Sequence, residues 1–292
     1  MQKRDSVSSA KWEMTFPATL ETELDSATFV HRLIKISSSF ILDKRGIFEN
    51  HGDTFFKSRI IEKLYIPMFN KDNTMAKLLI DKIEALKEAI QKKYLREFAI
   101  VFYQTPDEED VMEVFAFRLM YGAEDQIEVS LSSDIDSEEF SENLIQATFT
   151  DLDATKAVFS DTIKKVHRCI KQLDNLPHES DASFRVSFTP ETPNDYIPTG
   201  YDASSEFYKL NSSAAKRQIG VICGGHHKLQ FLAASRLWKS VPDLNQSIGS
   251  CNQSIIALST KAKSVKGSQK KTDRVEQRMP YGKTLTINKN RA

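Results

Sequence analysis

Hydrophobic residues recur at helical spacing in four stretches of the chain. In each stretch the apolar positions follow an i, i+3, i+4 pattern, which predicts one buried face per helix. Asp25 or Ser26 is a plausible N-cap for the first helix, and Gly46 can end it by adopting a left-handed conformation. The four predicted helices cover residues 25–43, 54–69, 73–93 and 153–173.

After the third predicted helix the hydrophobic period changes to two. Residues 95–103, 111–121 and 127–131 are rich in β-branched and aromatic side chains and are separated by the turn-forming sequences TPDEED and GAED. This pattern predicts an antiparallel meander. A further alternating stretch at 183–188 predicts a strand that joins the sheet after the fourth helix. The fold class is therefore α+β, with helices packed on an antiparallel sheet.

The strand at 183–188 runs into a segment that cannot continue it. Residues 189–201 read TPETPNDYIPTGY. The three prolines remove backbone donors and bias the residues before them toward extended conformations, so neither a helix nor a central strand fits. Tyr196 and Tyr201 nevertheless bring apolar surface into the segment. We expect an ordered strap that lies across the body of the domain.

Composition narrows the setting in which the protein works. The chain has no run of about 18 apolar residues, which argues against a membrane span, and its first residues lack the apolar region of a secretory signal. Cys169, Cys223 and Cys251 are odd in number and lack CxxC spacing, so free thiols in a reducing compartment are expected. The net charge is zero, but residues 261–292 carry ten Lys or Arg against two acids, leaving the preceding residues about eight units acidic.

The chain offers few groups for catalysis or metal binding. Cys223, His226 and His227 have the right chemistry for zinc, but a closed site needs four ligands and adjacent histidines in a strand point to opposite faces. Cys223 with His226 as a catalytic pair lacks an oxyanion site and a residue that orients the base. The GxxxxGK[ST] phosphate loop does not occur. The sequence therefore predicts no catalytic, cofactor-binding or metal-binding residues and no cofactor.

The order of elements and several segments resemble the HORMA family, and within it the meiotic chromosome-axis members, notably the short nematode ones. The resemblance covers residues 15–245. It is most specific in the segment TPETPNDYIPTGY, because that segment follows the right strand. The other segments are DKRGIF at 43–48, LREFAIVFY at 95–103 and EVFAFRLMYG at 113–122.

The resemblance implies a mechanism. HORMA domains bind a short peptide, called a closure motif, as an added strand, and the C-terminal part of the domain wraps over it as a safety belt. Here the belt would span about 190–240, with a returning strand within 218–229, where Gly220, Gly224 and Gly225 predict a bulge or a close backbone approach. The belt residues implied by the resemblance are Tyr196, Pro198, Gly200, Tyr201, Val221, His226 and His227.

The last residues have the composition expected of a ligand for such a site. Residues 279–288, MPYGKTLTIN, form an aromatic and β-capable island in a basic, polar tail. The resemblance implies a closure motif here, which lets one copy recruit another. The alternative is a slightly apolar tail end without a binding role. The candidate motif residues are Met279, Pro280, Tyr281, Gly282, Leu285 and Ile287.

Together these observations predict a flexible N-terminus (1–14), a HORMA-like domain (15–245), a disordered basic linker (246–278) and a candidate closure motif (279–292). The expected function is a non-enzymatic, peptide-binding scaffold of meiotic chromosome axes in the nucleus, supporting homologue pairing, synapsis and recombination control. Expected partners are closure-motif peptides of other axis HORMA proteins, a second copy of this chain and, by resemblance, an AAA+ remodelling ATPase. The basic tail could contact DNA by counterion release, and a solubilising or nuclear-targeting tail is equally consistent. Association with chromatin is expected, and direct DNA binding is left open. Alternatives are a spindle-checkpoint or translesion-polymerase HORMA adaptor, or a Cys/His enzyme or metal-binding protein.

Overall fold

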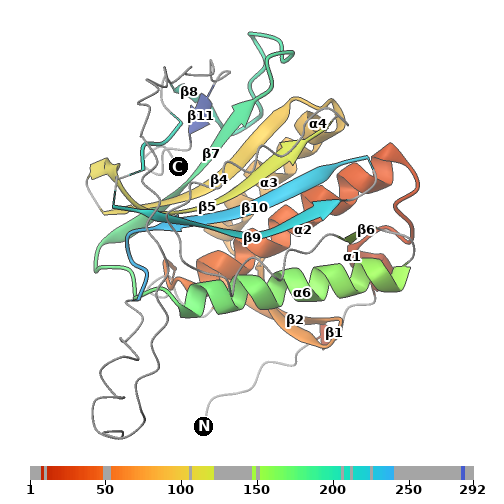
Figure 1. Ribbon diagram of the computed structural model, residues 1–292, viewed down its shortest axis with the longest axis horizontal. Coiled ribbons are helices and arrows are strands. Elements are labelled where there is room, and N and C mark those ends of the chain that lie inside the picture. Colours follow the sequence, from red (N-terminus) through yellow and green to blue (C-terminus); the bar gives the residue numbers. More distant parts are fainter. Residues whose placement is uncertain are drawn as a thin grey trace, which may run out of the picture. The chain divides into compact units, whose positions relative to one another are not determined.

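The structure is a computed structural model of the chain (Figure 1). The helices and strands discussed below belong to one compact unit, Met1–Trp238 with Tyr281–Ala292. The predicted strand at 127–131 and the predicted linker at 246–278 lie outside the described residues. The structure describes residues 8–9, 12–48, 54–104, 107–121, 147–148, 152–204, 207–210, 213–223, 226–239 and 284–286, with the backbone alone at 8–9, 107–109, 147–148, 223 and 284–286.

An eight-stranded sheet forms the centre of this unit (Figure 1). The predicted pairing of residues 95–103 with 111–121 is confirmed, because β4 and β5 form an antiparallel ladder. The predicted strand at 183–188 joins the free side of β4 as β7. In spatial order the strands are β6 (Ala147–Thr148), β9 (Ala215–Cys223), β10 (Lys228–Ser235), β5 (Asp107–Met120), β4 (Leu95–Gln104), β7 (Ser180–Phe188), β11 (Thr284–Thr286) and β8 (Asp202–Ser204).

Four helices supply apolar side chains to one face of the sheet: α2 (Glu23–Lys44), α3 (Thr74–Glu84), α4 (Leu86–Gln91) and α6 (Leu152–Lys171). The first and fourth predicted helices are confirmed as α2 and α6. The predicted helix at 73–93 is two helices, α3 and α4, that meet at Ala85. The N-cap of α2 is Thr22 rather than Asp25 or Ser26, and its side chain accepts a hydrogen bond from the Asp25 backbone.

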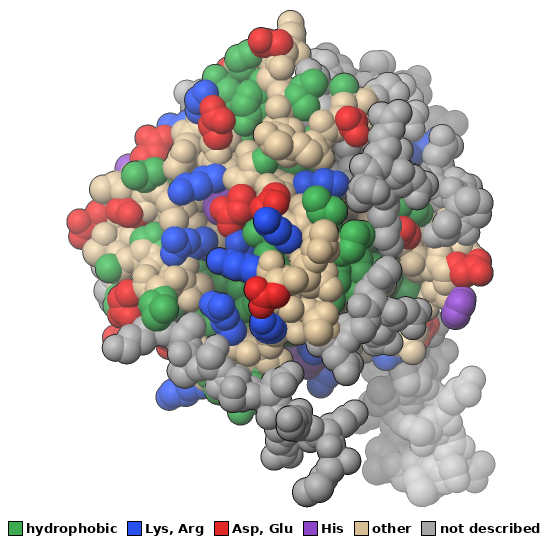
Figure 2. Space-filling view, turned by 180° about the vertical axis from the view of Figure 1, so that it is seen from behind, with side chains coloured by type: hydrophobic (Ala, Val, Ile, Leu, Met, Phe, Trp, Pro, Cys, Tyr) green, Lys and Arg blue, Asp and Glu red, His purple; other side chains and the backbone are tan. Residues whose placement is uncertain are grey.

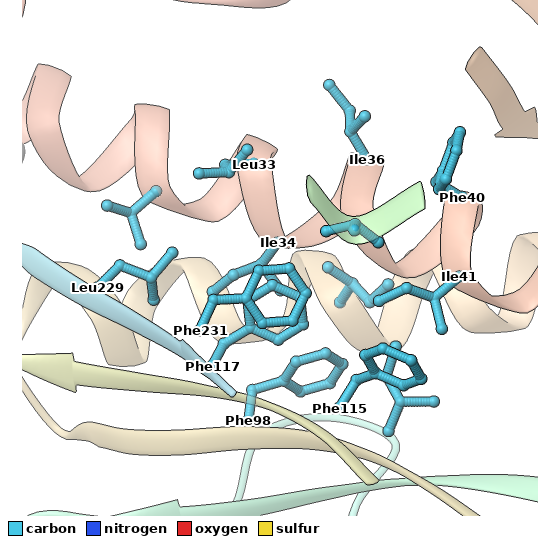
Figure 3. Close-up of a cluster of buried hydrophobic side chains, with 14 of the residues drawn as sticks. Leu33, Ile34, Ile36, Phe40, Ile41, Phe98, Phe115, Phe117, Leu229 and Phe231 are labelled. Carbon is cyan, nitrogen blue, oxygen red and sulfur yellow. The ribbon is translucent and has the colours of Figure 1, made fainter. Parts of the chain in front are cut away.

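The main core lies between α2 and the sheet. Figure 3 shows Ile34 and Ile41 of α2 facing aromatic rings that rise from the strands. Phe117 of β5 and Phe231 of β10 stack at a centroid distance of 4.1 Å. Stacked and edge-on rings of this kind bury much apolar area with a defined geometry, so they fix how β10 sits against β5.

The opposite face of the sheet carries a smaller apolar cluster. It consists of small and β-branched residues of β4 and β5, with Ala99 and Ala116 at paired positions. Alternate residues of a strand point to opposite faces, so the aromatic residues of β4 and β5 go to the helical side and these small residues to the outer side. The described segment Phe207–Leu210, called here the crossing segment, packs on this outer cluster.

The prediction of a helix over 54–69 is wrong. These residues form an antiparallel hairpin of β2 (Phe56–Ile61) and β3 (Leu64–Phe69). Glu62 and Lys63 make the turn with φ values of 45° and 64°. Two consecutive left-handed residues give the twist that a two-residue hairpin turn needs, so the local turn overrides the helical spacing.

Two features of this hairpin explain why the prediction of a helix failed. Tyr65, one of the apolar positions of the predicted helix, is 67% exposed, because strand alternation turns it outward. Pro67 is tolerated in β3, which lies at the edge of its sheet, where the missing donor is not needed. The other side of the hairpin is covered by β1 (Ser8–Ser9), which pairs with β2 in parallel.

The flexible N-terminus predicted for 1–14 also requires correction. A short helix, α1 (Trp12–Thr15), lies within the fold, and Trp12 is only 3% exposed. The Trp12 ring stacks on Phe16 at 4.4 Å and meets Phe159 of α6 edge-on at 5.8 Å. The packed domain therefore begins at or before Trp12. None of the helices in the described ranges combines the length and apolarity needed to cross a membrane.

Candidate functional site

The candidate site is the groove between β7 and β8. These two strands do not pair with each other, because the backbone of Thr284–Thr286 lies between them as β11 and pairs with both in antiparallel fashion. Figure 1 shows β11, drawn in dark blue, between the labels of β7 and β8. A segment from the far end of the sequence thus extends the sheet by one strand.

The register of β11 fixes which groups of the groove face the inserted strand. Leu285 pairs with Val186 on one side and Ala203 on the other. Val186 is fully buried in the main core, whereas Arg185 and Ser187 lie on the outer face with their register partners in β4, Ala99 and Glu97. Directly opposed residues of antiparallel strands share a face. Any strand in this register therefore has its central position on the core face and its two flanking positions on the outer face.

The strap at 189–201 leaves β7 and runs along α4 and α3. Its first residue donates a backbone hydrogen bond to the Tyr94 carbonyl at 2.7 Å. The Tyr196 ring meets Tyr94 and Phe188 edge-on at 5.3 and 5.6 Å. Burial, together with Glu88 and Tyr94, raises the pKa of Tyr196 to about 12. The strap is therefore tied to the start of β4 and to the end of β7.

The end of the strap is the most deeply placed part of it. Tyr201 is 5% exposed and belongs to the main core, and its amide donates to the Pro198 carbonyl at 3.2 Å. Its hydroxyl has no hydrogen-bond partner among the described residues, and burial raises its pKa. Gly200 has φ +84°, and a Cβ there would lie 2.9 Å from the Lys82 side chain. Glycine is required by both the conformation and the close contact.

The crossing segment was not singled out by the sequence. Phe207 and Tyr208 pack against each other at 4.6 Å over the outer cluster. The Tyr208 hydroxyl donates to Glu97 Oε1 at 2.8 Å, and the Phe207 carbonyl accepts from Arg185 at 2.9 Å. Only the three apolar residues of FYKL hinted at docking, and the residues they contact lie on strands more than twenty positions away in the sequence. The chain thus passes from the groove across the open face of the sheet.

The returning part of the chain is a hairpin of two strands, β9 and β10, rather than the single strand predicted within 218–229. Val221 is 2% exposed in β9. The ladder shifts register where Phe231 pairs with Gly220, which confirms the bulge predicted at Gly220. Gly224 and Gly225 lie outside the described residues.

The two histidines of this hairpin fasten its tip to α2. His226 is exposed and contacts the Glu21 carbonyl through Nε2 at 3.0 Å. His227 is fully buried, with Nδ1 2.9 Å from the Ser26 hydroxyl. Burial lowers the pKa of His227, with Glu23 opposing and Lys93 adding to the shift. Both rings therefore have structural contacts.

A buried ion pair fixes the other end of the hairpin. Arg45, after the end of α2, contacts Glu113 of β5 through Nε–Oε1 at 2.9 Å and Nη2–Oε2 at 3.0 Å. The Ser235 hydroxyl of β10 donates to the same carboxylate at 3.3 Å, and Arg45 also donates to the Asp174 carbonyl. Burial raises the pKa of Glu113 to about 7, with Arg45 opposing the shift. This network joins α2, β5, β10 and the end of α6.

Of the candidate motif residues, the structure describes only the backbone of Leu285. Met279, Pro280, Tyr281, Gly282 and Ile287 lie outside the described residues. The side chain of Cys223 also lies outside them, so its predicted free thiol stays a prediction. Cys169 is a free, buried thiol, and burial raises its pKa to about 12.

Comparisons with known proteins agree with this architecture. A model of the HORMA domain family matches residues 26–227. HORMA domain-containing protein 2 of Bos taurus is 25% identical over 239 residues, which span 80% of this chain and 74% of that protein. HORMA domain-containing protein 1 of Rattus norvegicus is 27% identical over 192 residues, which span 64% of this chain and 46% of that protein. The structure of C. elegans HTP-2 bound to the HIM-3 closure motif has a TM-score of 0.65 at 25% identity, covering 80% of this chain and 100% of the HTP-2 chain.

Proposed function

Because this chain belongs to the HORMA-domain family, we propose that it binds closure-motif peptides as an added strand between β7 and β8, without acting as an enzyme. The observation that carries the proposal is the position of β11, which pairs with both walls of the groove. The similarity to HTP-2, whose solved structure holds a closure motif, supports the same conclusion.

The groove supplies affinity and selectivity in different ways. The facing edges of β7 and β8 carry backbone donors and acceptors that an inserted strand of any sequence can satisfy. Selectivity comes from the side chains at each register position. Opposite Val186 the inserted strand meets the core face, which favours an apolar residue. Opposite Arg185 and Ser187 it meets a polar outer face, which tolerates small polar residues.

The belt that retains the peptide consists of the strap, β8, the crossing segment and the β9–β10 hairpin. A strand held between β7 and β8 leaves only after part of this belt detaches. Release is therefore coupled to a local unfolding step, and bound peptides dissociate slowly even from a small interface.

The chain's own C-terminus is the first candidate ligand. We assign Met279, Pro280, Tyr281, Gly282, Leu285 and Ile287 to a closure motif that can occupy the groove of the same copy or of a second copy. A groove and a fitting tail on one chain form a heterologous pair, which links copies head to tail when the tail reaches a neighbour. Capture within one copy competes with this, because a tethered tail acts at an effective concentration on the order of millimolar.

We propose that the protein acts in the nucleus as part of the scaffold of the meiotic chromosome axis. In this role the protein supports homologue pairing, synapsis and recombination control, and larger axis proteins recruit it through their closure motifs. Remodelling by an AAA+ ATPase and association with chromatin belong to the same proposal. Its cellular test is the localisation of a tagged copy in meiotic nuclei, where an axial signal supports the proposal and exclusion from chromosomes contradicts it.

The direct test uses the full chain and a labelled synthetic peptide of residues 279–292. A chain carrying Leu285→Asp loses its own competing strand, because the register puts an aspartate opposite Val186 on the core face. We expect it to bind one labelled peptide, and a scrambled peptide of the same composition to bind more than about 100-fold more weakly. Equal binding of the two peptides, or no binding of either, refutes the proposal.

A further inference from the structure

The crossing segment is held by groups of a different kind from those that hold the strap. Tyr201 at the end of the strap is buried in the main core, whereas Phe207, Tyr208 and Leu210 are partly buried over the small outer cluster. Apolar burial scales with the area removed from water, so the crossing segment has the weaker apolar anchor. Its attachment depends more heavily on hydrogen bonds.

Those hydrogen bonds converge on buried charges. Tyr208 donates its hydroxyl to Glu97 Oε1 at 2.8 Å, while Arg118 donates to Glu97 Oε2 at 2.9 Å. Glu97 is 5% exposed, so the Tyr208 hydroxyl and the Arg118 guanidinium both satisfy a carboxylate that is largely withdrawn from water. Hydrogen bonds to a charged acceptor are about twice as strong as neutral ones. Tyr208 therefore holds the crossing segment through the hydrogen bond of its hydroxyl as well as through the packing of its ring.

A second bond joins the crossing segment to the wall of the groove. Arg185 of β7 is 7% exposed and donates from Nη1 to the Phe207 carbonyl at 2.9 Å, and its Nε lies 3.2 Å from the Ser183 hydroxyl. The backbone of Arg185 pairs with Thr286 of the inserted strand. The same residue thus contacts the inserted strand through its backbone and the crossing segment through its side chain.

We propose that Tyr208, through its hydrogen bond to the Glu97–Arg118 pair, is the positioning residue that keeps the belt shut, and that the belt opens first at the crossing segment. The inference rests on the proposed peptide-binding function and adds where release begins. Tyr196 and Tyr201, which the sequence points to, hold the strap to the core. The crossing segment detaches while they stay in place.

The test measures peptide release from the full chain in the Leu285→Asp background, in which the chain's own strand does not compete. The protein is loaded with the labelled peptide of residues 279–292 and chased with excess unlabelled peptide. Tyr208→Phe keeps the ring over the outer cluster and removes only the hydroxyl. We expect release about tenfold faster, since one hydrogen bond to a charged group is lost. Tyr65→Phe, on the exposed hairpin tyrosine, is the matched control and should leave the rate unchanged.

Two further measurements test whether Tyr208→Phe acts on the opening of the belt in particular. Tyr208→Phe should lower the free energy of global unfolding in urea by no more than the faster release represents, about 1.4 kcal/mol for a tenfold change, and Tyr65→Phe should leave it unchanged. Amide exchange in β8 should accelerate in Tyr208→Phe alone. An unchanged release rate in Tyr208→Phe, or a faster rate without faster amide exchange in β8, overturns the inference. Failure of the Leu285→Asp chain to load any peptide instead refutes the proposed function.

Discussion

The buried hydroxyl of Tyr201 leads to the prediction that removing it stabilises the fold. The ring fills a place in the main core, while the hydroxyl is buried without a hydrogen-bond partner among the described residues. Tyr201→Phe removes the hydroxyl and keeps the ring, and Tyr201→Ala removes both. The first change should stabilise the fold and the second should destabilise it.

The magnitudes follow from the surroundings of Tyr201. A buried, unsatisfied polar group costs about 1–3 kcal/mol of folding free energy, and the void left by one oxygen atom returns only about 0.3 kcal/mol of this. Tyr201→Phe should therefore raise the free energy of unfolding by about 1 kcal/mol. Tyr201→Ala opens a cavity at a site that is 5% exposed, and should lower it by about 3–4 kcal/mol.

The assay is urea unfolding followed by tryptophan fluorescence, since Trp12 and Trp238 report on two separate parts of the fold. Peptide release supplies the second measurement. β8 begins directly after Tyr201, so the Ala variant should release bound peptide faster and the Phe variant should not. A loss of 1 kcal/mol or more in Tyr201→Phe would refute the reasoning, because it would mean that the hydroxyl has a partner.

Three further predictions concern single sites. Gly200→Ala should destabilise the fold by about 1–2 kcal/mol, because alanine at φ +84° is strained and its Cβ meets the Lys82 side chain; an unchanged urea midpoint contradicts this. Glu113→Gln should cost about 3–5 kcal/mol in the same assay by leaving Arg45 buried and uncompensated, and a cost below 1 kcal/mol would show that the pair is dispensable. Burial lowers the pKa of His227 from 6.5, so the folded state binds fewer protons than the unfolded state at mildly acidic pH. The contribution of His227 to the free energy of unfolding is therefore complete above about pH 6.5 and is lost as the pH falls below this value. His227→Gln should flatten this acid limb of the stability profile, and an identical pH profile in the variant counts against the assignment.

The sequence predicted those elements whose local pattern and tertiary environment agree. The helix at 25–43 and the strand at 95–103 have apolar side chains in the spacing that the core later uses, so period alone identified them. The hairpin at 56–69 failed for the opposite reason. Its apolar residues fit a helix as well as two strands, and the turn at Glu62 and Lys63 decided between them.

The strap shows the same division at the candidate site. Its prolines and tyrosines predicted an irregular segment that packs on the domain, and Tyr196 and Tyr201 do lie against the body of the domain. The crossing segment carried no comparable signal. Tyr208 matters because Glu97 of β4 lies beneath it, and those two residues are 111 positions apart.

The sequence by itself determined the α+β class, the order of most elements, the break after β7 and the apolar island near the C-terminus. These follow from local rules of period, proline geometry and composition. Only the tertiary structure decided that residues 284–286 enter between β7 and β8 and that the chain then crosses the outer face to reach β9. Strand pairing and buried polar contacts join residues that are distant in sequence, and their partners are set by the register of the whole sheet.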